Sequence, residues 1–432
     1  MKMANMDDYF DVVIVGTGAA GLYCALNLPA RYRILLLTKQ KADESDSFLA
    51  QGGICMQHGE ADYRPFFDDT MRAGHYENNP ATVDLMIRSS NSIIRDLVRR
   101  GVRFARDDHG ALRFTREGAH SRPRILFHED ITGHEITQTL LNEVLRCENI
   151  ELREHTTLLD FFADASACGG VIAAGPDGEP RAIGAGAVVL ACGGIGGLYK
   201  NSTNFPHITG DAIAMALRHG VACEHLDYIQ IHPTTLYSHR KGRRFLISES
   251  VRGEGALLLD KNGNRFTNEL QPRDVVSAAI RAQMEKDGTD FVWEDMRPLG
   301  EAAIREHFPN ILERCEEEGY DPIHEPIPVV PAQHYFMGGI TADLSSRTAL
   351  PRLYACGETC CNGVHGRNRL ASNSLLESLV FAQRAADDIL YGEPPVFTGD
   401  KPDLAPYREQ EPLFAAYRQE VLTAIERSKN HE

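Results

Sequence analysis

The fold is decided by the stretch Tyr9-Phe-Asp-Val-Val-Ile-Val-Gly-Thr-Gly-Ala-Ala-Gly21, close to the start of the chain. Four consecutive β-branched apolar residues precede its first glycine, which predicts a strand buried on both faces. The three glycines have the G-x-G-x-x-G spacing, and a helix is predicted over residues 22–28. In this motif Gly16 makes the tight turn, Gly18 lets the backbone approach a pyrophosphate, and Gly21 lets the helix pack closely against the strand. The stretch therefore predicts a dinucleotide-binding βαβ unit, with the anion at the helix N-terminus.

The end of the second predicted strand indicates which dinucleotide is bound. This strand is Arg33-Ile-Leu-Leu-Leu-Thr38. An Asp or Glu that binds the ribose of NAD is expected at about this point, roughly twenty residues after the glycines. The chain instead has Thr38 followed by Lys39. A cation here fits a phosphate-rich adenine dinucleotide, and we expect FAD.

A second glycine-rich segment does not complete a second dinucleotide fingerprint. The segment Ala187-Val-Val-Leu-Ala-Cys-Gly-Gly-Ile-Gly-Gly197 predicts a buried strand, but no helix-forming run follows it. We therefore assign its glycines to the same flavin site and expect no pyridine nucleotide as electron donor. A helix is predicted over residues 209–218, with Thr209 or Asp211 near its start. Asp211 either caps this helix or binds the flavin.

Composition excludes several classes of partner. The chain has 432 residues and a formal net charge of -16, which disfavours nucleic acid and anionic membrane surfaces. No apolar run approaches the length of a membrane span, and the polar start of the chain predicts no signal peptide. An anionic substrate would then need a local cluster of cations. We expect a cytoplasmic protein.

The ten cysteines do not indicate a metal site. Only Cys356, Cys360 and Cys361 are close in sequence, and no Cys-x-x-Cys pair recurs. A zinc or iron–sulfur centre is therefore not expected. Scattered cysteines are typical of reduced thiols in a cytoplasmic protein.

The predicted elements divide the chain into two domains and a tail. The βαβ pattern stops after about residue 220 and returns near Leu353. We predict an α/β, Rossmann-like FAD-binding domain, discontinuous over 1–220 and 336–395, with an inserted α+β capping domain over 221–335. A substrate between two such domains is a common arrangement. Residues 396–432 are expected to form a C-terminal tail.

Two charged runs are predicted to be loops. The run Arg113 to Arg124, which contains Glu117, favours a solvated loop, and Ser248 to Gly255 is predicted to be a charged loop with two glycines.

Three further segments carry candidate functional residues. His232 is predicted at a strand end before Pro233, where a lone histidine is more often structural. A helix is predicted to open at Pro272, which puts Arg273 in the first turn, where the helix dipole disfavours a cation. An anionic partner explains this arginine better than an exposed position does. In the loop Gly363 to Glu377, we expect Ser372-Asn-Ser374 to cap a helix aimed at the flavin, where its dipole would stabilise negative charge.

Taken together, six motifs resemble those of the succinate dehydrogenase/fumarate reductase flavoprotein family. The similarity covers about residues 8–392, and the motifs occur in the same order. They are the glycine fingerprint at Gly16, Ala50-Gln-Gly-Gly-Ile54, Arg252-Gly-Glu-Gly255, Pro272-Arg-Asp274, His334-Tyr-Phe-Met-Gly-Gly339 and His365-Gly-Arg-Asn-Arg369.

The resemblance implies a dicarboxylate site between the flavin domain and a mobile cap. It implies that His232, His334 and Arg369 hold the substrate carboxylates, and that Ser248 donates a hydroxyl to the substrate. Arg273 resembles the proton-transfer residue of the family. A guanidinium is a poor base, so Arg273 either has a pKa lowered by neighbouring cations or only stabilises charge.

Two positions place the chain in a branch of this family. Glu117 stands where the branch that oxidises L-aspartate carries an acid and succinate dehydrogenases carry a neutral amide. A carboxylate there would receive the substrate ammonium; the alternative is a surface pair with Arg116 or Arg122. Asp46 stands where membrane-bound relatives tether FAD through a histidine. We therefore expect non-covalent FAD.

The expected FAD-binding residues come from the fingerprint, the second strand, the Gln-Gly-Gly segment and the C-terminal helix start. They are Gly16, Gly18, Ala19, Gly21, Thr38, Lys39, Ser47, Ala50, Gln51, Gly52, Gly53, Asp211, Glu358, Ser372, Ser374 and Leu375.

The resemblance implies an FAD-dependent oxidoreductase that converts L-aspartate to iminoaspartate by hydride transfer to flavin N5. Quinolinate synthase would consume the product in NAD biosynthesis, and either O2 or fumarate would accept the electrons. The alternatives are a soluble fumarate reductase or succinate dehydrogenase flavoprotein, and a non-catalytic flavin-binding redox or sensor protein. The chain departs from the pattern at Arg367, where relatives more often carry a small residue. It also ends at Glu432, without the added helical domain of longer relatives.

Overall fold

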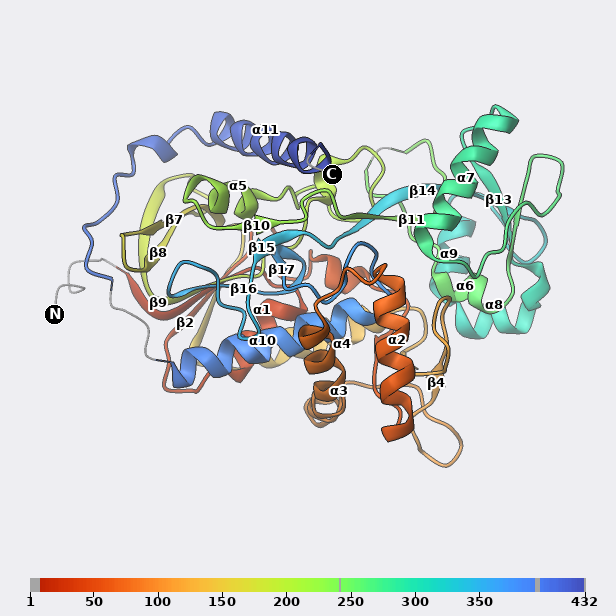
Figure 1. Cartoon of the computed structure of the whole chain (residues 1–432), viewed down its shortest axis with the longest axis horizontal. Coiled ribbons are helices and arrows are strands. Elements are labelled where there is room, and N and C mark those ends of the chain that lie inside the picture. The colour runs from red at the N-terminus through yellow and green to blue at the C-terminus, as the bar shows by residue number, and fades with distance from the viewer. Residues whose placement is uncertain (1–7, 241, 393–396, 431–432) are drawn as a thin grey trace.

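The computed structural model describes residues 8–240, 242–392 and 397–430. The expectation of no signal peptide depends mostly on residues 1–7, which lie outside the described residues. Figure 1 shows a larger body that contains the main sheet and a smaller one formed by the middle of the chain.

The larger body is built on a seven-stranded sheet whose centre is the strand predicted from the fingerprint. The order is β6-β2-β1-β9-β8-β7, and β16 pairs with β9. The pairs of β1 with β2 and β9 are parallel, as are those of β2 with β6 and of β9 with β16. The strands are β1 (Tyr9–Val15), β2 (Ile34–Leu37), β6 (Ile150–Arg153), β7 (Thr157–Ala163), β8 (Cys168–Ala174), β9 (Pro180–Leu190) and β16 (Leu353–Ala355).

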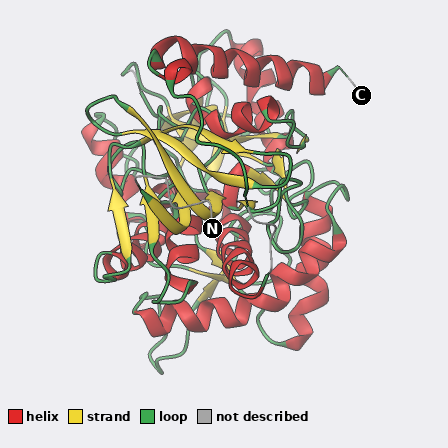
Figure 2. Cartoon of the chain, turned by 90° about the vertical axis from the view of Figure 1, so that its left-hand side faces the viewer, coloured by secondary structure: helices red, strands yellow, loops and turns green. Residues whose placement is uncertain are grey.

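Alternate residues of β1 face two separate cores. Val12 and Ile14 lie in one apolar cluster, while Val13 and Val15 lie in the other. This alternation explains why every residue of the run is apolar. Figure 2 shows the sheet between two layers of helices. One layer contains α1 (Ala19–Asn27), α3 (Pro80–Arg100), α4 (Thr132–Val144) and α10 (Asn373–Tyr391), and the other contains α5 (Asp211–Arg218) and α11 (Gln410–Lys429).

Several short elements complete the larger body. They form two small three-stranded sheets, one helix and a one-turn 3-10 segment. These elements are α2 (Tyr63–Ala73), η2 (Asp46–Leu49), β3 (Ile54–Cys55), β4 (Phe114–Thr115), β5 (Ile125–Leu126), β10 (Cys223–Glu224), β15 (Gly339–Thr341) and β17 (Cys360–Cys361).

The smaller body has an antiparallel sheet and its own core. Figure 1 shows β11 and β14 running from the larger body into it. A separate apolar cluster, drawn from residues between 236 and 329, fills it. Its strands, in sheet order, are β11 (Ile229–Leu236), β14 (Ile327–Phe336), β13 (Val292–Asp295) and β12 (Leu257–Leu259), and its helices are α6 (Glu249–Gly253), α7 (Arg273–Asp287), α8 (Glu301–His307) and α9 (Pro309–Glu317).

Three local predictions were wrong. His232 lies inside β11 and not at a strand end, because a register shift after it accommodates Pro233, which has no N–H to donate. Pro272 occupies the N-cap of α7, so Arg273 is the first helical residue. The charged segment that begins at Ser248 forms the short helix α6 instead of a loop.

The C-terminal tail was also predicted too simply. Residues 410–429 form the 20-residue helix α11. Its residues Tyr417, Val421 and Ile425 are buried in the core beside α5. Apolar side chains at this three-to-four-residue spacing are the ordinary signal for an amphipathic helix, and the prediction overlooked them. None of the helices in the described residues is both long and apolar enough to cross a lipid bilayer.

Candidate active site

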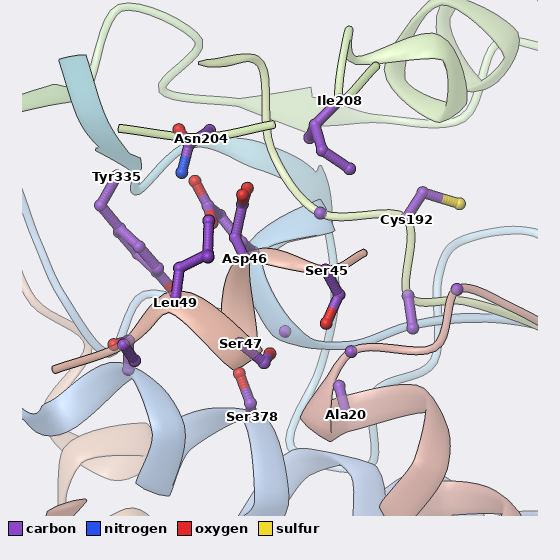
Figure 3. A pocket seen from close by; sticks show the side chains of 18 of the residues that line it. Ala20, Ser45, Asp46, Ser47, Leu49, Cys192, Asn204, Ile208, Tyr335 and Ser378 are labelled. Carbon is purple, nitrogen blue, oxygen red and sulfur yellow. The ribbon is translucent and has the colours of Figure 1, made fainter. Parts of the chain in front are cut away.

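A large cavity opens where the parallel strands β1, β2 and β9 end. Ligands of α/β proteins bind at this edge of the sheet. Figure 3 shows Ser45, Asp46 and Leu49 on one side of the cavity, facing Asn204 and Ile208 on the other. The expected FAD-binding residues that line it are Gly16, Gly18, Thr38, Lys39, Ser47, Ala50, Gln51, Gly52, Gly53, Asp211, Glu358, Ser372, Ser374 and Leu375.

The glycine turn has the geometry that the sequence predicted. Gly16 has a φ of +113°, and a Cβ there would lie 2.0 Å from the carbonyl oxygen of Ala191. A Cβ on Gly21 would lie 1.9 Å from the carbonyl oxygen of Gly16. The backbone N–H of Ala19 donates to Ser47 Oγ at 3.0 Å. Gly21 and Ala19 therefore shape the turn and do not line the cavity. Gly21 lets α1 pack against the Gly16 carbonyl, and Ala19 links the start of α1 to Ser47 in η2.

The cation predicted after β2 is already paired within the protein. Lys39 Nζ donates to Asp211 Oδ2 at 2.7 Å, and the Thr209 hydroxyl donates to the other oxygen of Asp211 at 2.7 Å. Two expected FAD-binding residues thus form one ion pair on the cavity wall. Asp211 is also the first residue of α5, where a carboxylate is favoured by the helix dipole.

The polar atoms of the cavity wall fit a large polar ligand such as FAD. Ser45 Oγ, Asp46 Oδ2 and Gln51 Oε1 are buried and have no hydrogen-bond partner among the described residues. Buried polar atoms without a partner are costly and are normally satisfied by a ligand or water. Burial also raises the pKa of Asp46 to about 7. Together with the glycine turn, these atoms fit a dinucleotide that approaches the backbone closely.

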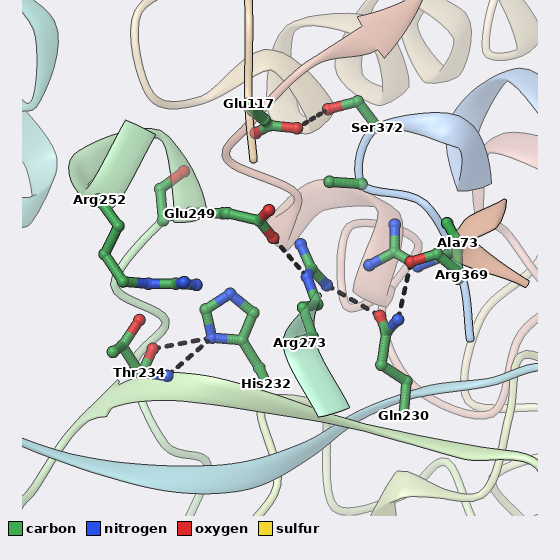
Figure 4. Close-up of polar contacts among 12 residues, drawn as sticks. Ala73, Glu117, Gln230, His232, Thr234, Glu249, Arg252, Arg273, Arg369 and Ser372 are labelled. Carbon is green, nitrogen blue, oxygen red and sulfur yellow. Dashed lines mark hydrogen bonds and ion pairs between the residues drawn. The ribbon is translucent and has the colours of Figure 1, made fainter. Parts of the chain in front are cut away.

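The residues predicted to bind substrate converge on the same cavity. His232, His334, Arg369, Arg273, Ser248 and Glu117 all line it, although they come from distant parts of the chain. They belong to β11, β14, the loop before α10, the start of α7, the N-cap of α6 and the loop after β4. Figure 4 shows several of these side chains, together with their polar partners.

The two histidines form an edge-on pair with ring centroids 5.1 Å apart. His232 Nδ1 lies 2.9 Å from the Thr234 carbonyl oxygen and 3.2 Å from the Thr234 nitrogen, while its Nε2 has no partner among the described residues. His334 Nδ1 lies 2.8 Å from Thr203 Oγ1. Burial and nearby arginines lower the pKa of both rings well below the usual range. Both are therefore neutral, with one ring nitrogen held by the protein.

Two arginines are held beside each other by a shared glutamine. Arg273 Nε donates to Glu249 Oε2 at 2.6 Å, and its Nη1 donates to Gln230 Oε1 at 2.9 Å. Gln230 Nε2 in turn donates to the carbonyl oxygen of Arg369 at 2.8 Å (Figure 4). Burial and the charge of Arg273 lower the pKa of Arg369 to about 10. Two buried cations this close fit a ligand with more than one negative charge.

The Arg369 guanidinium can still donate a hydrogen bond to such a ligand. Its Nη1 donates to Ser374 Oγ at 2.9 Å, and its Nε is buried without a partner among the described residues. The guanidinium also lies 4.7 Å from the ring centre of Tyr335. The ring and the hydroxyl fix the orientation of the guanidinium, so it can receive a carboxylate without reorganising.

Glu117 is a buried carboxylate that lines the same cavity as these arginines. It is 3% exposed, and it accepts hydrogen bonds from Ser372 Oγ at 2.6 Å and Ser250 Oγ at 3.1 Å. Burial and the nearby Glu249 raise its pKa. The alternative of a surface pair with Arg116 or Arg122 is wrong, because both arginines are exposed whereas Glu117 faces the cavity.

Two serines at the cavity also take part in the local structure, and Ser372 differs from its predicted role as a helix cap. Ser372 occupies the N-cap of α10 with a φ of +62°, but its hydroxyl donates to Glu117 and does not cap the helix. Ser248 caps α6 by accepting from the Ser250 N–H at 3.3 Å. Its hydroxyl also lines the cavity. Both hydroxyls are therefore shared between the cavity and the local structure.

Sequence reasoning did not single out several residues that organise the site. Glu249, Gln230 and Ser250 hold Arg273, Arg369 and Glu117 respectively. Arg252 was noted only as part of a motif, yet it is 2% exposed and donates to the carbonyl oxygen of Glu269 at 3.0 Å. A buried charge inside a short polar helix gives no periodic signal, so only the folded chain identifies these partners.

The described residues contain no group of His, Cys, Asp or Glu side chains arranged to hold a metal ion. The ten cysteines are all free thiols.

Comparisons with known proteins agree with this geometry. The chain matches a family described as an FAD binding domain over residues 11–375. It is 48% identical to an L-aspartate oxidase of Clostridium perfringens, over 88% of this chain and 86% of that protein. It is 47% identical to an L-aspartate oxidase of Clostridium acetobutylicum, over 88% and 87% of the two chains.

The solved structures similar to this one include fumarate reductases. A variant of the Escherichia coli quinol fumarate reductase superposes with a TM-score of 0.83 at 31% identity, covering 95% of this chain and 74% of that one. A quinol-fumarate reductase with menaquinol molecules gives a TM-score of 0.85 at 32% identity, over 95% and 75% of the two chains. These similarities confirm the predicted fold class and the FAD cofactor.

Proposed function

The chain belongs to the succinate dehydrogenase/fumarate reductase flavoprotein family, and from this premise we propose that it oxidises L-aspartate to iminoaspartate. Bound FAD supplies the hydride acceptor. The wall of the cavity at the end of β1, β2 and β9 would hold it, with Gly16 and Gly18 facing the pyrophosphate. Because Asp46 replaces the histidine that tethers FAD in membrane-bound relatives, we propose that FAD is bound without a covalent link.

The substrate carboxylates would lie among His232, His334 and Arg369. Each histidine has one ring nitrogen held by the protein, so the other can donate when it carries the proton. Arg369 supplies the fixed positive charge. Preorganised donors of this kind would hold the substrate in one orientation and avoid reorganisation during the reaction.

The observation that carries the proposal is the buried carboxylate of Glu117 beside these cations. Succinate and fumarate have no positive group, whereas aspartate has an ammonium on the carbon that loses hydride. Glu117 lies in the same cavity as Arg369 and Arg273, with its two oxygens oriented by Ser372 and Ser250. An ammonium bound there would stabilise the ionised form of Glu117 against the effect of burial. The site therefore favours aspartate over an amino-free dicarboxylate.

Arg273 would stabilise negative charge at the reacting end of the substrate. The Glu249 carboxylate balances the positive charge of Arg273. The hydrogen bond from Arg273 Nη1 to Gln230 fixes the direction of the guanidinium. Proton transfer by Arg273 is the alternative role that the family resemblance implies. In either role the arginine must remain buried, which requires residues 221–335 to close over the cavity as a cap.

The wider setting of the reaction follows from its product. Iminoaspartate is unstable, so we propose that quinolinate synthase consumes it in NAD biosynthesis within the cytoplasm. Either O2 or fumarate would reoxidise the flavin.

An anaerobic flavin spectrum tests the proposal directly. The purified yellow holoprotein is mixed with L-aspartate under nitrogen, and in parallel with succinate. We expect aspartate to bleach the flavin band and succinate to perturb it without rapid bleaching. Bleaching by succinate alone would instead identify a succinate dehydrogenase or fumarate reductase. An unchanged spectrum with both ligands would indicate a non-catalytic flavin protein.

A further inference from the structure

His120 is buried three residues after Glu117, and the proposed reaction does not use it directly. Its Nδ1 lies 2.8 Å from Arg124 Nη1, and its Nε2 lies 3.0 Å from the carbonyl oxygen of Ala371. Arginine can only donate, so Nδ1 must accept and the ring proton must be on Nε2. The tautomer is thus fixed, and His120 donates a hydrogen bond to Ala371.

The arginine that fixes this tautomer is itself immobilised. Arg124 is fully buried and pairs with Asp62 at 3.0 Å and Asp69 at 2.8 Å. Asp69 also accepts from the backbone N–H and hydroxyl of Ser121, at 2.7 and 2.6 Å. Burial and Arg124 lower the pKa of His120 to about 4, so the ring stays neutral. A neutral imidazole with a fixed proton is a rigid donor.

The backbone that His120 contacts leads directly to Glu117. Ala371 precedes Ser372, whose φ of +62° is unusual for a residue other than glycine. The Ser372 carbonyl oxygen accepts from the Cys55 N–H at 3.0 Å, and its hydroxyl donates to Glu117 Oε2 at 2.6 Å. The direction of this hydroxyl therefore depends on the backbone at Ala371 and Ser372.

We propose that His120 is a positioning residue for amino-group recognition. By holding the carbonyl of Ala371, it keeps the strained backbone at Ser372 in the conformation that aims the hydroxyl at Glu117. Glu117 is then fixed where it can receive the substrate ammonium. This inference rests on the proposed function. It adds that the chain distinguishes an amino dicarboxylate from a plain dicarboxylate through a buried unit of Arg124, His120 and Ser372.

The experiment compares His120→Leu and His120→Gln with the wild-type holoprotein. A glutamine can accept from Arg124 and donate to Ala371, whereas leucine can do neither. For each protein we would measure FAD content, the dissociation constant of succinate from the flavin spectrum, and KM and kcat for L-aspartate. His128→Gln is the matched control, because His128 is in the same segment but is partly exposed and lies 3.9 Å from Glu135.

For His120→Leu we expect KM for aspartate to rise about tenfold, from the loss of a buried hydrogen bond. Succinate binding and FAD content should stay within about twofold of wild type, and His120→Gln should recover most of the loss. Equal losses for aspartate and succinate in both variants would overturn the inference, and so would an unchanged KM for aspartate. If the wild-type protein does not oxidise aspartate, the proposed function is wrong, and the inference about His120 is wrong with it. If the wild-type protein oxidises aspartate and only the variants depart from these expectations, the inference alone is wrong.

Discussion

The two walls of the cavity recognise ligands in different ways. The wall at the end of β1, β2 and β9 presents backbone and glycines, and the charge of Lys39 on this wall is balanced by Asp211. The opposite wall, contributed largely by residues 229–334, presents the side chains of His232, Arg273 and His334. The first wall suits a large ligand held by shape, and the second a small ligand held by charge. The comparison predicts that changes in the two walls will separate FAD binding from turnover.

The largest effect is expected for Arg369→Leu. The substitution keeps the apolar stem but removes the fixed charge that the proposal assigns to a substrate carboxylate. We expect kcat/KM for aspartate to fall by about 10²- to 10³-fold, as for a buried charge that loses its partner, with FAD content unchanged. Arg146→Leu, which changes an exposed arginine, is the control. A variant with normal turnover would show that the second wall does not bind through this charge.

Gly16→Ala, in the first wall, should impair FAD binding, whereas Arg369→Leu should leave it intact. A Cβ at this position would lie 2.0 Å from the Ala191 carbonyl oxygen, in addition to the strain at φ +113°. We expect destabilisation of about 2–4 kcal/mol and loss of FAD.

Thermal unfolding and the FAD content of the purified protein measure both effects of Gly16→Ala. Gly101→Ala is the matched control: its φ is +105°, but nothing lies within 4 Å of the added methyl. That control should show only the cost of strain, about 1 kcal/mol. Equal effects at both positions would mean that the contact with the Ala191 carbonyl, just after β9, is unimportant.

A smaller effect is expected where the two bodies meet. The carboxylate of Asp130, in the larger body, accepts from Asn310 Nδ2 at 2.5 Å and from the Ile311 N–H at 3.1 Å at the start of α9. Asp130→Ala should destabilise this contact by about 1–2 kcal/mol, the cost of a lost helix cap. Hydrogen exchange of α9 should then increase while FAD stays bound. Asp130→Asn can still accept one hydrogen bond, so its stability should lie between those of wild type and Asp130→Ala.

The sequence could predict the first wall in detail because its signals are local. The β1 run is apolar on both faces, and the spacing of Gly16, Gly18 and Gly21 can be read within one short segment, where a Cβ on Gly21 would meet the Gly16 carbonyl oxygen. The predicted fold class and cofactor were therefore correct. Apolar spacing was also present in α11 but was overlooked, and the bulge at Pro233 was not visible as a pattern.

The second wall could be predicted only in part, because its geometry depends on contacts between distant segments. The charged run around Glu117 favoured a solvated loop, and only the folded chain brings it to Ser372, 255 residues away. Glu249 and Gln230 had no local signal, since their partners Arg273 and Arg369 lie elsewhere in sequence. The family resemblance supplied candidate roles for His232, His334 and Arg369 in holding the substrate carboxylates, and those roles stay predictions.

The central claim is that Glu117 recognises the substrate ammonium, and Glu117→Gln tests it most directly. The measurement is KM for L-aspartate, together with the dissociation constant of succinate, as a function of pH in wild type and variant. Burial raises the pKa of Glu117, so the carboxylate is ionised only above that raised value, and wild-type affinity for aspartate should fall as pH decreases through it. We predict that, above this pKa, Glu117→Gln lowers the affinity for aspartate about 10- to 100-fold. The variant should lose the pH dependence of aspartate affinity, and its affinity for succinate should equal that of wild type. An unchanged affinity for aspartate, or an equal loss for succinate, would contradict the account.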